Sequence, residues 1–487
     1  MPAAEIAQPA VDVQAGYASE ISRARSSLAR KRIFAFGRIF LWGTLFAAPL
    51  AFGAVQPWAW CALAITAAVL LVLWAAGNFR GGTIRVYWSP IYLPAAAFLV
   101  VAAVQYFAGL TLDRAATQEA LCKLTTDFAL FFLAGQFLAE VTEPQWRRMG
   151  LAITLYTLAV GVFATLQFSS SHNLIYWVVP SPGYTFGPYV NHNHYAGLME
   201  MLIPLSAASV VSRVPLDRAP RASLPNRALE SGIILLGFAV LIPAASLLLS
   251  GSRGGFISLI VELVLAAILI FARGPRRSRK TAAVAGGAAI LAAVLLFFWM
   301  APRQIAERFT TMADVAHPHE VSLAERLAPA MDSLRIFCDH SLLGAGLGSF
   351  ETVFPRYQSF PSDSRWDYAH NDYAQALAET GLAGGALILC ALGLFFWLAF
   401  GKVAGPRRSV SIPVGAGRGG RESTFPLPTA HGAVPSAYFL RWGAALGCCG
   451  LLVHSFVDFN LHIPANAAWF AVCAAIATAG GSAVVSS

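Results

Sequence analysis

The stretch WDYAHNDYAQALAETG, Trp366–Gly381, leads directly into the apolar run Leu382–Phe400. A run of about 20 mostly apolar residues can cross a bilayer as a helix, so this junction places polar side chains at a membrane surface. On a helix, His370, Tyr373 and Leu377 would share one face, because positions i, i+3 and i+7 align. The junction therefore predicts a short amphipathic helix beside a membrane-spanning one.

This junction has two interpretations. A histidine is the side chain most easily poised as a base near neutral pH, so His370 is a candidate catalytic group. The tryptophan and tyrosines around it are also typical of an interfacial helix anchored at the membrane surface. Gly381 is a natural end for such a helix in either case. The spacing alone favours the anchoring interpretation.

The composition identifies an integral membrane protein. Of the 487 residues, 57% are hydrophobic and only 12% are charged, whereas a soluble domain carries about 25% charged residues. The net charge of +9 does not indicate nucleic acid, because the basic residues fall in short clusters between apolar runs, as they do in cytoplasmic loops. The seven cysteines form no CxxC motif and no disulfide framework.

The apolar runs predict about twelve transmembrane helices. In the first half of the chain they are Ile39–Pro57, Trp58–Ala76, Ile91–Phe107, Thr125–Leu138, Gly150–Ser169 and Tyr195–Val211. In the second half they are Gly232–Ser250, Gly255–Ala272, Ala282–Met300, Leu382–Phe400, Tyr438–Val457 and Ala465–Gly480. Basic residues in the N-terminal tail and in every second connection predict that both termini are cytoplasmic.

The expected fold is an all-α integral membrane protein with a large helical periplasmic loop between helices 9 and 10. Its expected divisions are a disordered cytoplasmic N-terminal tail (1–32), transmembrane helices 1–9 (33–300), the periplasmic loop (301–381) and helices 10–12 (382–480). A segment rich in Gly, Pro and Arg at 402–437 is expected to form a flexible cytoplasmic insert.

Arg253 is the most unusual charge, because it lies on the external side at the start of a span. The unpaired N–H groups and positive dipole of a helix start, combined with a guanidinium, form an anion site that suits phosphate. The alternative is an arginine that extends to lipid headgroups. More positive charge in the external loop comes from Arg326 and Arg356, for which pairing with neighbouring carboxylates is the default expectation.

A polar cluster, Asn191–His194, opens the sixth span. His192 and His194 would share a face on a strand and could then bind a metal, but a helix that begins here separates them. Asn193 is a candidate cap for that helix. No metal site is therefore expected at this cluster.

A second polar cluster lies at the outer end of the eleventh span, where His454, Asp458 and His462 are four residues apart. The Asp-Phe-Asn sequence and Pro464 favour the end of a helix over a continuous metal-binding face. Asp458 and His462 are expected on the same side of the membrane as His370.

Four stretches of the chain form an ordered set: NHNHYAG (Asn191–Gly197), SRGG (Ser252–Gly255), the loop segments Glu325–Phe350 and His370–Gly381, and HSFVDFNLHIPANA (His454–Ala467). This set resembles the bacterial O-antigen ligase and polymerase family. The resemblance implies a metal-independent, inverting glycosyltransferase of the bacterial inner membrane that needs no cofactor and acts at the periplasmic face. The donor would be a glycan on undecaprenyl diphosphate, and the acceptor would be lipid A-core or another glycan.

The resemblance also implies roles for individual residues. His370 matches the loop histidine proposed as the catalytic base, Arg253 matches an arginine implicated in diphosphate binding, and Arg326 matches a recurring loop arginine; Arg356 is a further candidate for the diphosphate. Candidates for orienting the base or binding substrate are Asn371, Tyr373, Asn191, Asn193, His194 and Asp458. Family members often have an arginine shortly before the N-x-N motif, but residues 183–187 contain none, so ligase and polymerase both stay open.

A transporter or flippase of a lipid-linked precursor is the alternative. Transporters tend to carry ionisable residues near the bilayer midplane, whereas the predicted spans are nearly free of charge, with Glu200 and Glu262 as the main exceptions. The polar residues concentrate outside the spans instead, which favours chemistry at the membrane surface.

Overall fold

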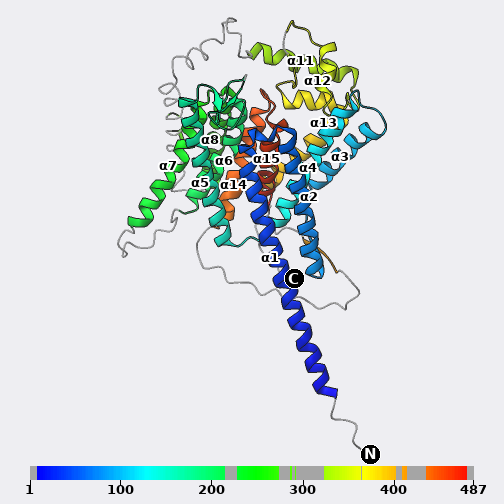
Figure 1. Cartoon of the computed structure of the whole chain (residues 1–487), viewed down its shortest axis with the longest axis vertical. Helices are drawn as coiled ribbons and strands as arrows, with labels where there is room; N and C mark the ends of the chain where they lie inside the picture. Colours follow the sequence, from blue (N-terminus) through cyan, green and yellow to red (C-terminus); the bar gives the residue numbers. More distant parts are fainter. Residues whose placement is uncertain are drawn as a thin grey trace, which may run out of the picture.

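The computed structural model describes residues 8–181, 183–213, 227–273, 286–287, 291, 323–362, 365–401, 409–413 and 435–479 (Figure 1). The described helices of the first half are α1 (Gln8–Leu50), α2 (Pro57–Arg80), α3 (Tyr92–Phe107), α4 (Arg114–Leu138), α5 (Glu143–Ser170) and α6 (His192–Val211). Those of the second half are α7 (Arg227–Leu249), α8 (Arg253–Arg273), α11 (Leu323–Asp339), α12 (Phe350–Val353), α13 (Asp372–Phe400), α14 (Ser436–His454) and α15 (Pro464–Ala477).

Short elements link these helices. The 3₁₀ turns are η1 (Phe52–Ala54), η3 (Phe354–Arg356) and η4 (Asn460–His462). Strand β1 (Thr83–Tyr87) pairs antiparallel with β4 (Ser409–Pro413), and β2 (Leu174–Ile175) pairs with β3 (Val179–Pro180). Part of the segment expected as a flexible insert thus forms β4, and the rest of that insert up to residue 434 lies outside the described residues.

The chain is a multi-pass membrane protein. Eight described helices are long and apolar enough to cross a membrane, and three shorter apolar helices, Tyr92–Phe107, Ile234–Leu249 and Pro464–Ala477, accompany them. Together they correspond to all but one of the expected spans. The expected ninth span, Ala282–Met300, lies outside the described residues except at positions 286, 287 and 291, so the number twelve stays a prediction.

Two expected boundaries differ from the structure. α1 begins at Gln8, so the expectation of a disordered N-terminal tail is wrong from that residue on. The membrane span continues toward the N-terminus as a helix because extending an existing helix by one residue costs little free energy. α4 extends outward to Arg114, well beyond the expected start at Thr125. Its outer turns contain the ion pair Lys123–Glu119, with 2.6 Å between Nζ and Oε1, which lowers the hydropathy of a segment that is nevertheless helical.

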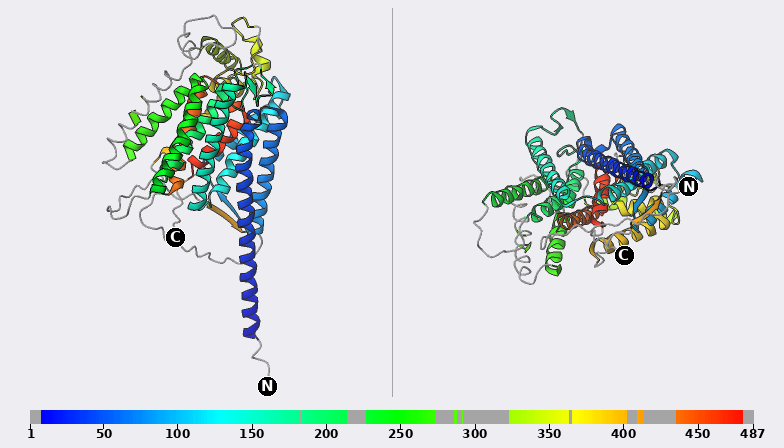
Figure 2. Two further views of the ribbon diagram at one scale, coloured as in Figure 1. Left: turned by 60° about the vertical axis from the view of Figure 1, so that its left-hand side comes forward. Right: turned by 90° about the horizontal axis from the view of Figure 1, so that it is seen from below.

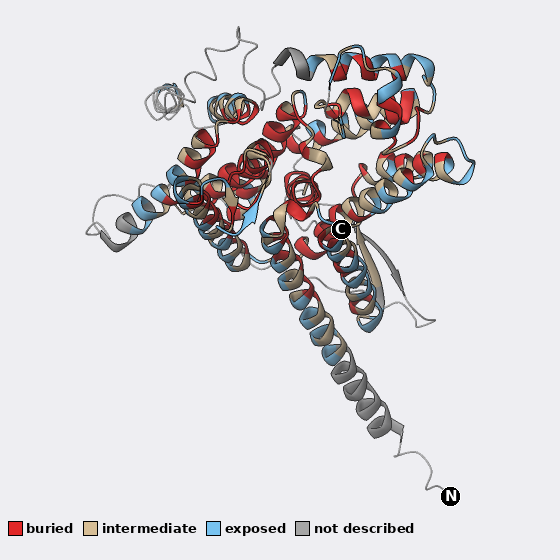
Figure 3. Ribbon diagram, turned by 45° about the horizontal axis from the view of Figure 1, so that its top comes forward, coloured by how far each residue is buried: buried red, intermediate tan, exposed pale blue. Residues whose placement is uncertain are grey.

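α6 lies at the centre of the bundle, with α5, α7, α8 and α14 as neighbours. Glycines on α14 permit the closest of these contacts: a Cβ on Gly447 would lie 2.7 Å from Met201 Cα, and one on Gly443 would lie 2.6 Å from the carbonyl oxygen of Pro204. Small residues let helix backbones approach closely in membranes. Figure 3 shows the buried residues concentrated in the middle of the bundle, and Figure 2 gives two further views of the same arrangement.

An outer layer of α11, α12 and η3 covers the end of the bundle that lies opposite the N-terminus (Figure 1). It has a small apolar core of its own, formed by Ile336, Ala345, Phe350, Val353, Phe354, Ala369 and Ala378. Because Ala369 and Ala378 flank the start of α13, this core holds the polar junction of Trp366–Gly381 against the outer layer.

A glycine-rich loop, Gly344–Gly348, joins this layer to the membrane helices. Gly344 has φ +79°, and a Cβ there would lie 2.2 Å from the backbone carbon of Glu379 in α13. Gly381 has φ +61° inside α13, so the helical conformation is interrupted at this residue, as the sequence predicts. The amide of Gln105 in α3 donates to the carbonyl oxygens of Leu343 and Glu379 at 2.5 and 2.8 Å, which fixes the loop against the kink.

Replacing Gly344 tests this close approach. We expect Gly344→Ala to destabilise the protein strongly, because the added Cβ meets backbone and the left-handed conformation costs about 1–2 kcal/mol in addition. Gly109→Ala is the matched control, since Gly109 also has a positive φ, +68°, but no atom lies within 4 Å of its Cβ position. The measurement is the apparent unfolding temperature in detergent; equal losses in both variants would contradict the packing role of the loop.

Candidate active site

His370 lies just before α13. Asn371 caps the helix, and its Oδ1 accepts a hydrogen bond from the Ala374 amide at 2.9 Å. His370 itself has φ +51°, which is left-handed backbone. The expectation that His370, Tyr373 and Leu377 share a helical face is therefore wrong for His370, because asparagine is a strong N-cap and ends the helical geometry at position 371.

The start of α13 is bound to the end of α14 by three hydrogen bonds. The backbone amide of Asp372 donates to the Ser455 carbonyl at 2.9 Å. The Asn371 amide donates to the Phe456 carbonyl at 3.0 Å, and the Tyr373 hydroxyl donates to the Leu452 carbonyl at 2.7 Å. These contacts place His370 next to the residues that follow α14.

Asp458 is the acidic residue that His370 meets there. Its Oδ1 lies 3.8 Å from His370 Nδ1 and 3.8 Å from His194 Nε2. The carboxylate is fully buried, and its Oδ1 also accepts from the Phe459 amide at 2.8 Å. The Phe459 ring packs edge-on against both imidazoles, with centroid distances of 4.9 Å to His370 and 4.8 Å to His194.

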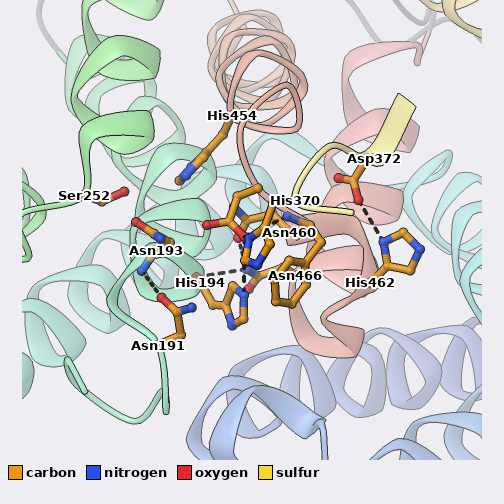
Figure 4. Close-up of polar contacts among 12 residues, drawn as sticks. Asn191, Asn193, His194, Ser252, His370, Asp372, His454, Asn460, His462 and Asn466 are labelled. Atoms are coloured by element: carbon orange, nitrogen blue, oxygen red, sulfur yellow. Dashed lines mark hydrogen bonds and ion pairs between the residues drawn. The ribbon is translucent and has the colours of Figure 1, made fainter. Parts of the chain in front are cut away.

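Figure 4 shows His370 between Ser252 on one side and the Asp372–His462 pair on the other. His194 belongs to α6 and His370 to the turn before α13. Three segments that are distant in sequence therefore supply the two imidazoles and one carboxylate of a single cluster, which we call the His370 cluster (His194, His370 and Asp458).

The first turn of α6 positions His194. Asn191 is the N-cap, and its Oδ1 accepts from the Asn193 amide at 2.8 Å. The expectation that Asn193 caps this helix is therefore wrong, because Asn191 already holds the extended backbone of a cap.

His192 packs on Tyr184, with 4.7 Å between ring centroids, whereas His194 faces Asp458. No group of three or more metal-ligating side chains occurs among the described residues.

Arg253 is the first residue of α8. Ser252 Oγ accepts from the Gly255 amide at 3.1 Å and so caps this helix. A Cβ on Gly254 would lie 2.3 Å from the His454 ring, and one on Gly255 would lie 2.7 Å from Ala196 Cβ. The S-R-G-G sequence thus lets the start of α8 pack directly on α6 and on the end of α14.

Beneath that contact lies a buried pair. His454 Nδ1 is 2.7 Å from Glu200 Oε1, and both side chains are fully buried. The sequence places both residues near the outer ends of their spans but contains no local signal that they meet.

A further pair, Asp372–His462, lies on the other side of the His370 cluster. Asp372 Oδ1 is 2.8 Å from His462 Nδ1, and Asp372 Oδ2 accepts from the Leu461 amide at 3.3 Å. Burial disfavours the imidazolium, but the hydrogen bond and negative charge of Asp372 outweigh it and raise the pKa of His462. The sequence gives no sign that these two residues pair, because they are 90 positions apart and meet only in the folded protein.

The remaining arginine candidates belong to the outer layer. Arg356 is exposed at the end of η3. Arg326 lies in α11, where its side chain is outside the described part of the chain. The structure therefore brings the start of α8, which carries Arg253, against His454 of α14, while the roles of Arg253, Arg326 and Arg356 stay predictions.

Comparison with known proteins gives one match. The family model described as O-antigen ligase matches residues 238–389, which include Arg253, Arg326, Arg356 and the His370–Tyr373 turn. The residues supplied by α6 and by the segment after α14 lie outside the matched stretch. No curated protein matches the chain. The match confirms the resemblance seen in the sequence and indicates a ligase- or polymerase-type function in the membrane.

The Asp372–His462 pair leads to a pH-dependent contribution to stability. Because the pKa of His462 is raised above its usual 6.5, the stabilisation is complete below pH 6.5 and is lost as the pH rises through the raised value. We expect the difference in apparent unfolding temperature between wild type and Asp372→Asn to shrink as the pH rises. Asp339→Asn, which alters an exposed contact to Tyr357, is the control; a difference that is constant with pH would show that the pair is not charged.

Proposed function

We propose that this chain, of which residues 238–389 match the O-antigen ligase family model, is a glycosyltransferase that moves a glycan from undecaprenyl diphosphate to an acceptor hydroxyl. The reaction would take place at the periplasmic face of the bacterial inner membrane. The observation that carries the proposal is the contact of His370 with the buried Asp458, at 3.8 Å, within a turn held at the ends of the membrane helices. A ligase with lipid A-core as acceptor and a polymerase with a glycan acceptor both fit.

His370 would be the catalytic base. Its Nδ1 faces Asp458, so Nε2 is the ring nitrogen that would take the proton of the acceptor hydroxyl. The acceptor oxygen would then attack the anomeric carbon as the bond from that carbon to the diphosphate oxygen breaks. A single displacement of this kind inverts the anomeric centre, and the buried carboxylate stabilises the imidazolium that forms.

Arg253 would hold the leaving diphosphate. The first amides of α8 and the positive end of its dipole favour an anion, and the guanidinium adds a charged donor. The packing of Gly254 against His454 keeps this helix start near the cluster. Arg326 and Arg356 in the outer layer would supply further positive charge toward the diphosphate or the glycan.

The other candidates have positioning roles in this proposal. Asn371 and Tyr373 direct their side chains to backbone carbonyls after and within α14, so they would fix the turn that carries His370. His194 shares the Asp458 carboxylate with His370 and would orient it. Asn191 and Asn193 shape the start of α6 beside the cluster. No metal or nucleotide is required by this mechanism.

Replacing the base tests the proposal. We expect His370→Asn to reduce glycan transfer by about 10²–10⁴-fold, the usual contribution of a general base. Asparagine tolerates the left-handed backbone of position 370, so the change removes the imidazole without adding strain. Transfer is measured with purified protein in lipid, an undecaprenyl-diphosphate-linked glycan and candidate acceptors, with chelator present.

His172→Asn is the matched control, because His172 is exposed and has almost the same φ, +52°. Arg253→Ala should also lose transfer, through weaker binding of the diphosphate. Full transfer by His370→Asn would place the catalytic base elsewhere. The transporter would instead be favoured if wild type binds the lipid-linked donor but transfers no glycan to any acceptor, and if Glu262→Gln, which alters a buried carboxyl within the span α8, abolishes transport of the donor.

A further inference from the structure

The buried pair Glu200–His454 has no part in the proposed mechanism. Glu200 lies in the span α6, and His454 is the last residue of the span α14. Their Oε1 and Nδ1 atoms are 2.7 Å apart, and neither side chain is exposed. Ionisable side chains are costly to place within membrane helices and are normally retained for a function. A pair out of reach of solvent and substrate would act through the groups packed against it.

The start of α8 packs on both members of this pair. A Cβ on Gly254 would lie 2.3 Å from Nε2 and from Cδ2 of His454. A Cβ on Gly255 would lie 3.3 Å from Glu200 Oε1. These glycines directly follow Arg253, the first residue of the helix. Because a side chain at position 254 would collide with the imidazole, the two glycines bring the helix start that carries Arg253 onto the pair.

The contact with Glu200 sets the orientation of the His454 ring. Nδ1 meets the carboxyl group, so the opposite edge of the ring, Cδ2 and Nε2, is the one that faces Gly254. Figure 4 shows His454 extending from α14 toward Ser252 on α8. Rotation of the ring would break a buried hydrogen bond and leave its groups desolvated, which is costly. The ring is therefore a fixed support for the first turn of α8.

The position of His454 also bears on the residues that follow α14. Its carbonyl oxygen accepts hydrogen bonds from the amides of Val457 and Asp458 at 2.9 and 3.1 Å. These bonds hold the turn in which Asp458 meets His370. One histidine thus contacts both halves of the proposed site, the start of α8 through its ring and the turn of Asp458 through its backbone.

A second contact ties α8 to α14 deeper in the membrane. Ser258 Oγ donates to the carbonyl oxygen of Gly450 at 2.9 Å. This bond lies more than one turn beyond Arg253, so it can hold the body of α8 when the contact at the helix start is lost. Breaking the Glu200–His454 pair should therefore displace the start of α8 without releasing the helix.

We propose that Glu200 and His454 are positioning residues for the donor site. Their hydrogen bond holds the start of α8, and with it Arg253, in place relative to the His370 cluster. The inference rests on the proposed glycosyl transfer, in which the diphosphate lies at Arg253 and the base is His370. These two groups act on the two bonds that form and break at one anomeric carbon, so a displacement of about 1 Å costs on the order of 10²-fold in rate.

Breaking the pair tests this role. We expect Glu200→Leu to lower kcat/KM for the donor by about 10²-fold, mainly through a higher donor KM, and to leave the acceptor KM unchanged. Glu200→Gln keeps an oxygen that can accept a hydrogen bond from Nδ1, so it should recover most of the loss. Steady-state transfer is measured with the full-length protein in lipid nanodiscs, first with the undecaprenyl-diphosphate-linked glycan as the varied substrate and then with the acceptor.

Glu262→Leu is the matched control. Glu262 is another buried carboxyl between α8 and α14, and its Oε1 packs against Gly450 instead of the first turn of α8. The same substitution therefore removes a buried carboxyl without touching the support of Arg253, and the donor KM should stay at the wild-type value. An equal rise in donor KM in both leucine variants would overturn the positioning role. A Glu200→Gln variant as impaired as Glu200→Leu would overturn it too.

His454→Asn serves if Glu200→Leu does not fold. The asparagine amide can donate to Glu200 in place of the Nδ1–H group, so the carboxyl keeps a partner. The ring edge that supports Gly254 is absent, however, and the donor KM should rise here as well, with the acceptor KM unchanged. A wild-type donor KM in folded His454→Asn would contradict the proposal.

Binding of undecaprenyl diphosphate without a glycan separates this inference from the proposed function. Native mass spectrometry of the protein released from nanodiscs detects this lipid and requires no transfer. Wild type and Glu262→Leu should retain the lipid at a concentration at which Glu200→Leu loses it. A wild type that neither binds the lipid nor transfers a glycan would refute the proposed function. A wild type that does both, with equal binding in Glu200→Leu, would refute the positioning role alone.

Discussion

A buried carboxylate, Asp458, is the group on which the outer end of this protein depends. It lies between His194 and His370, 3.8 Å from each, where α6, α14 and the turn before α13 meet. A buried charge is stable only when donors or opposite charges surround it, so these elements must dock in one arrangement. The hydrogen bonds of Asn371, Asp372 and Tyr373 to the end of α14 fix that docking.

Glycines make room for the polar groups around this carboxylate. A Cβ on Gly197 would lie 2.2 Å from Asn460 Oδ1, one on Gly254 would lie 2.3 Å from the His454 ring, and one on Gly450 would collide with Glu262. The spacing of residues within each short sequence pattern therefore has a packing cause as well as a chemical one. The N-x-N-H-Y-A-G, S-R-G-G and H-S-F-V-D-F-N stretches contact one another through these positions.

The sequence predicts most of the membrane helices, because hydropathy is a local property of the chain. It also predicts a break in the helix at Gly381, where α13 is interrupted. It also predicts that His370 and Asp458 lie on one side of the membrane. The sequence does not predict that His370 lies before the helix, because this position follows from capping by Asn371. It also does not predict the Asp372–His462 pair, because the two residues are 90 positions apart. The outer half of α4 is not predicted, because Arg114, Glu119 and Lys123 lower the hydropathy of a segment that is nevertheless helical.

The central claim is that the imidazole of His370 takes the acceptor proton. Chemical rescue of His370→Gly tests it most directly, because glycine fits the left-handed backbone of this position and leaves a space for free imidazole. The account predicts that His370→Gly is nearly inactive in glycan transfer, and that added imidazole restores transfer in a saturable manner, while Arg253→Ala is not rescued. Transfer at the wild-type rate by His370→Gly without imidazole would contradict the account.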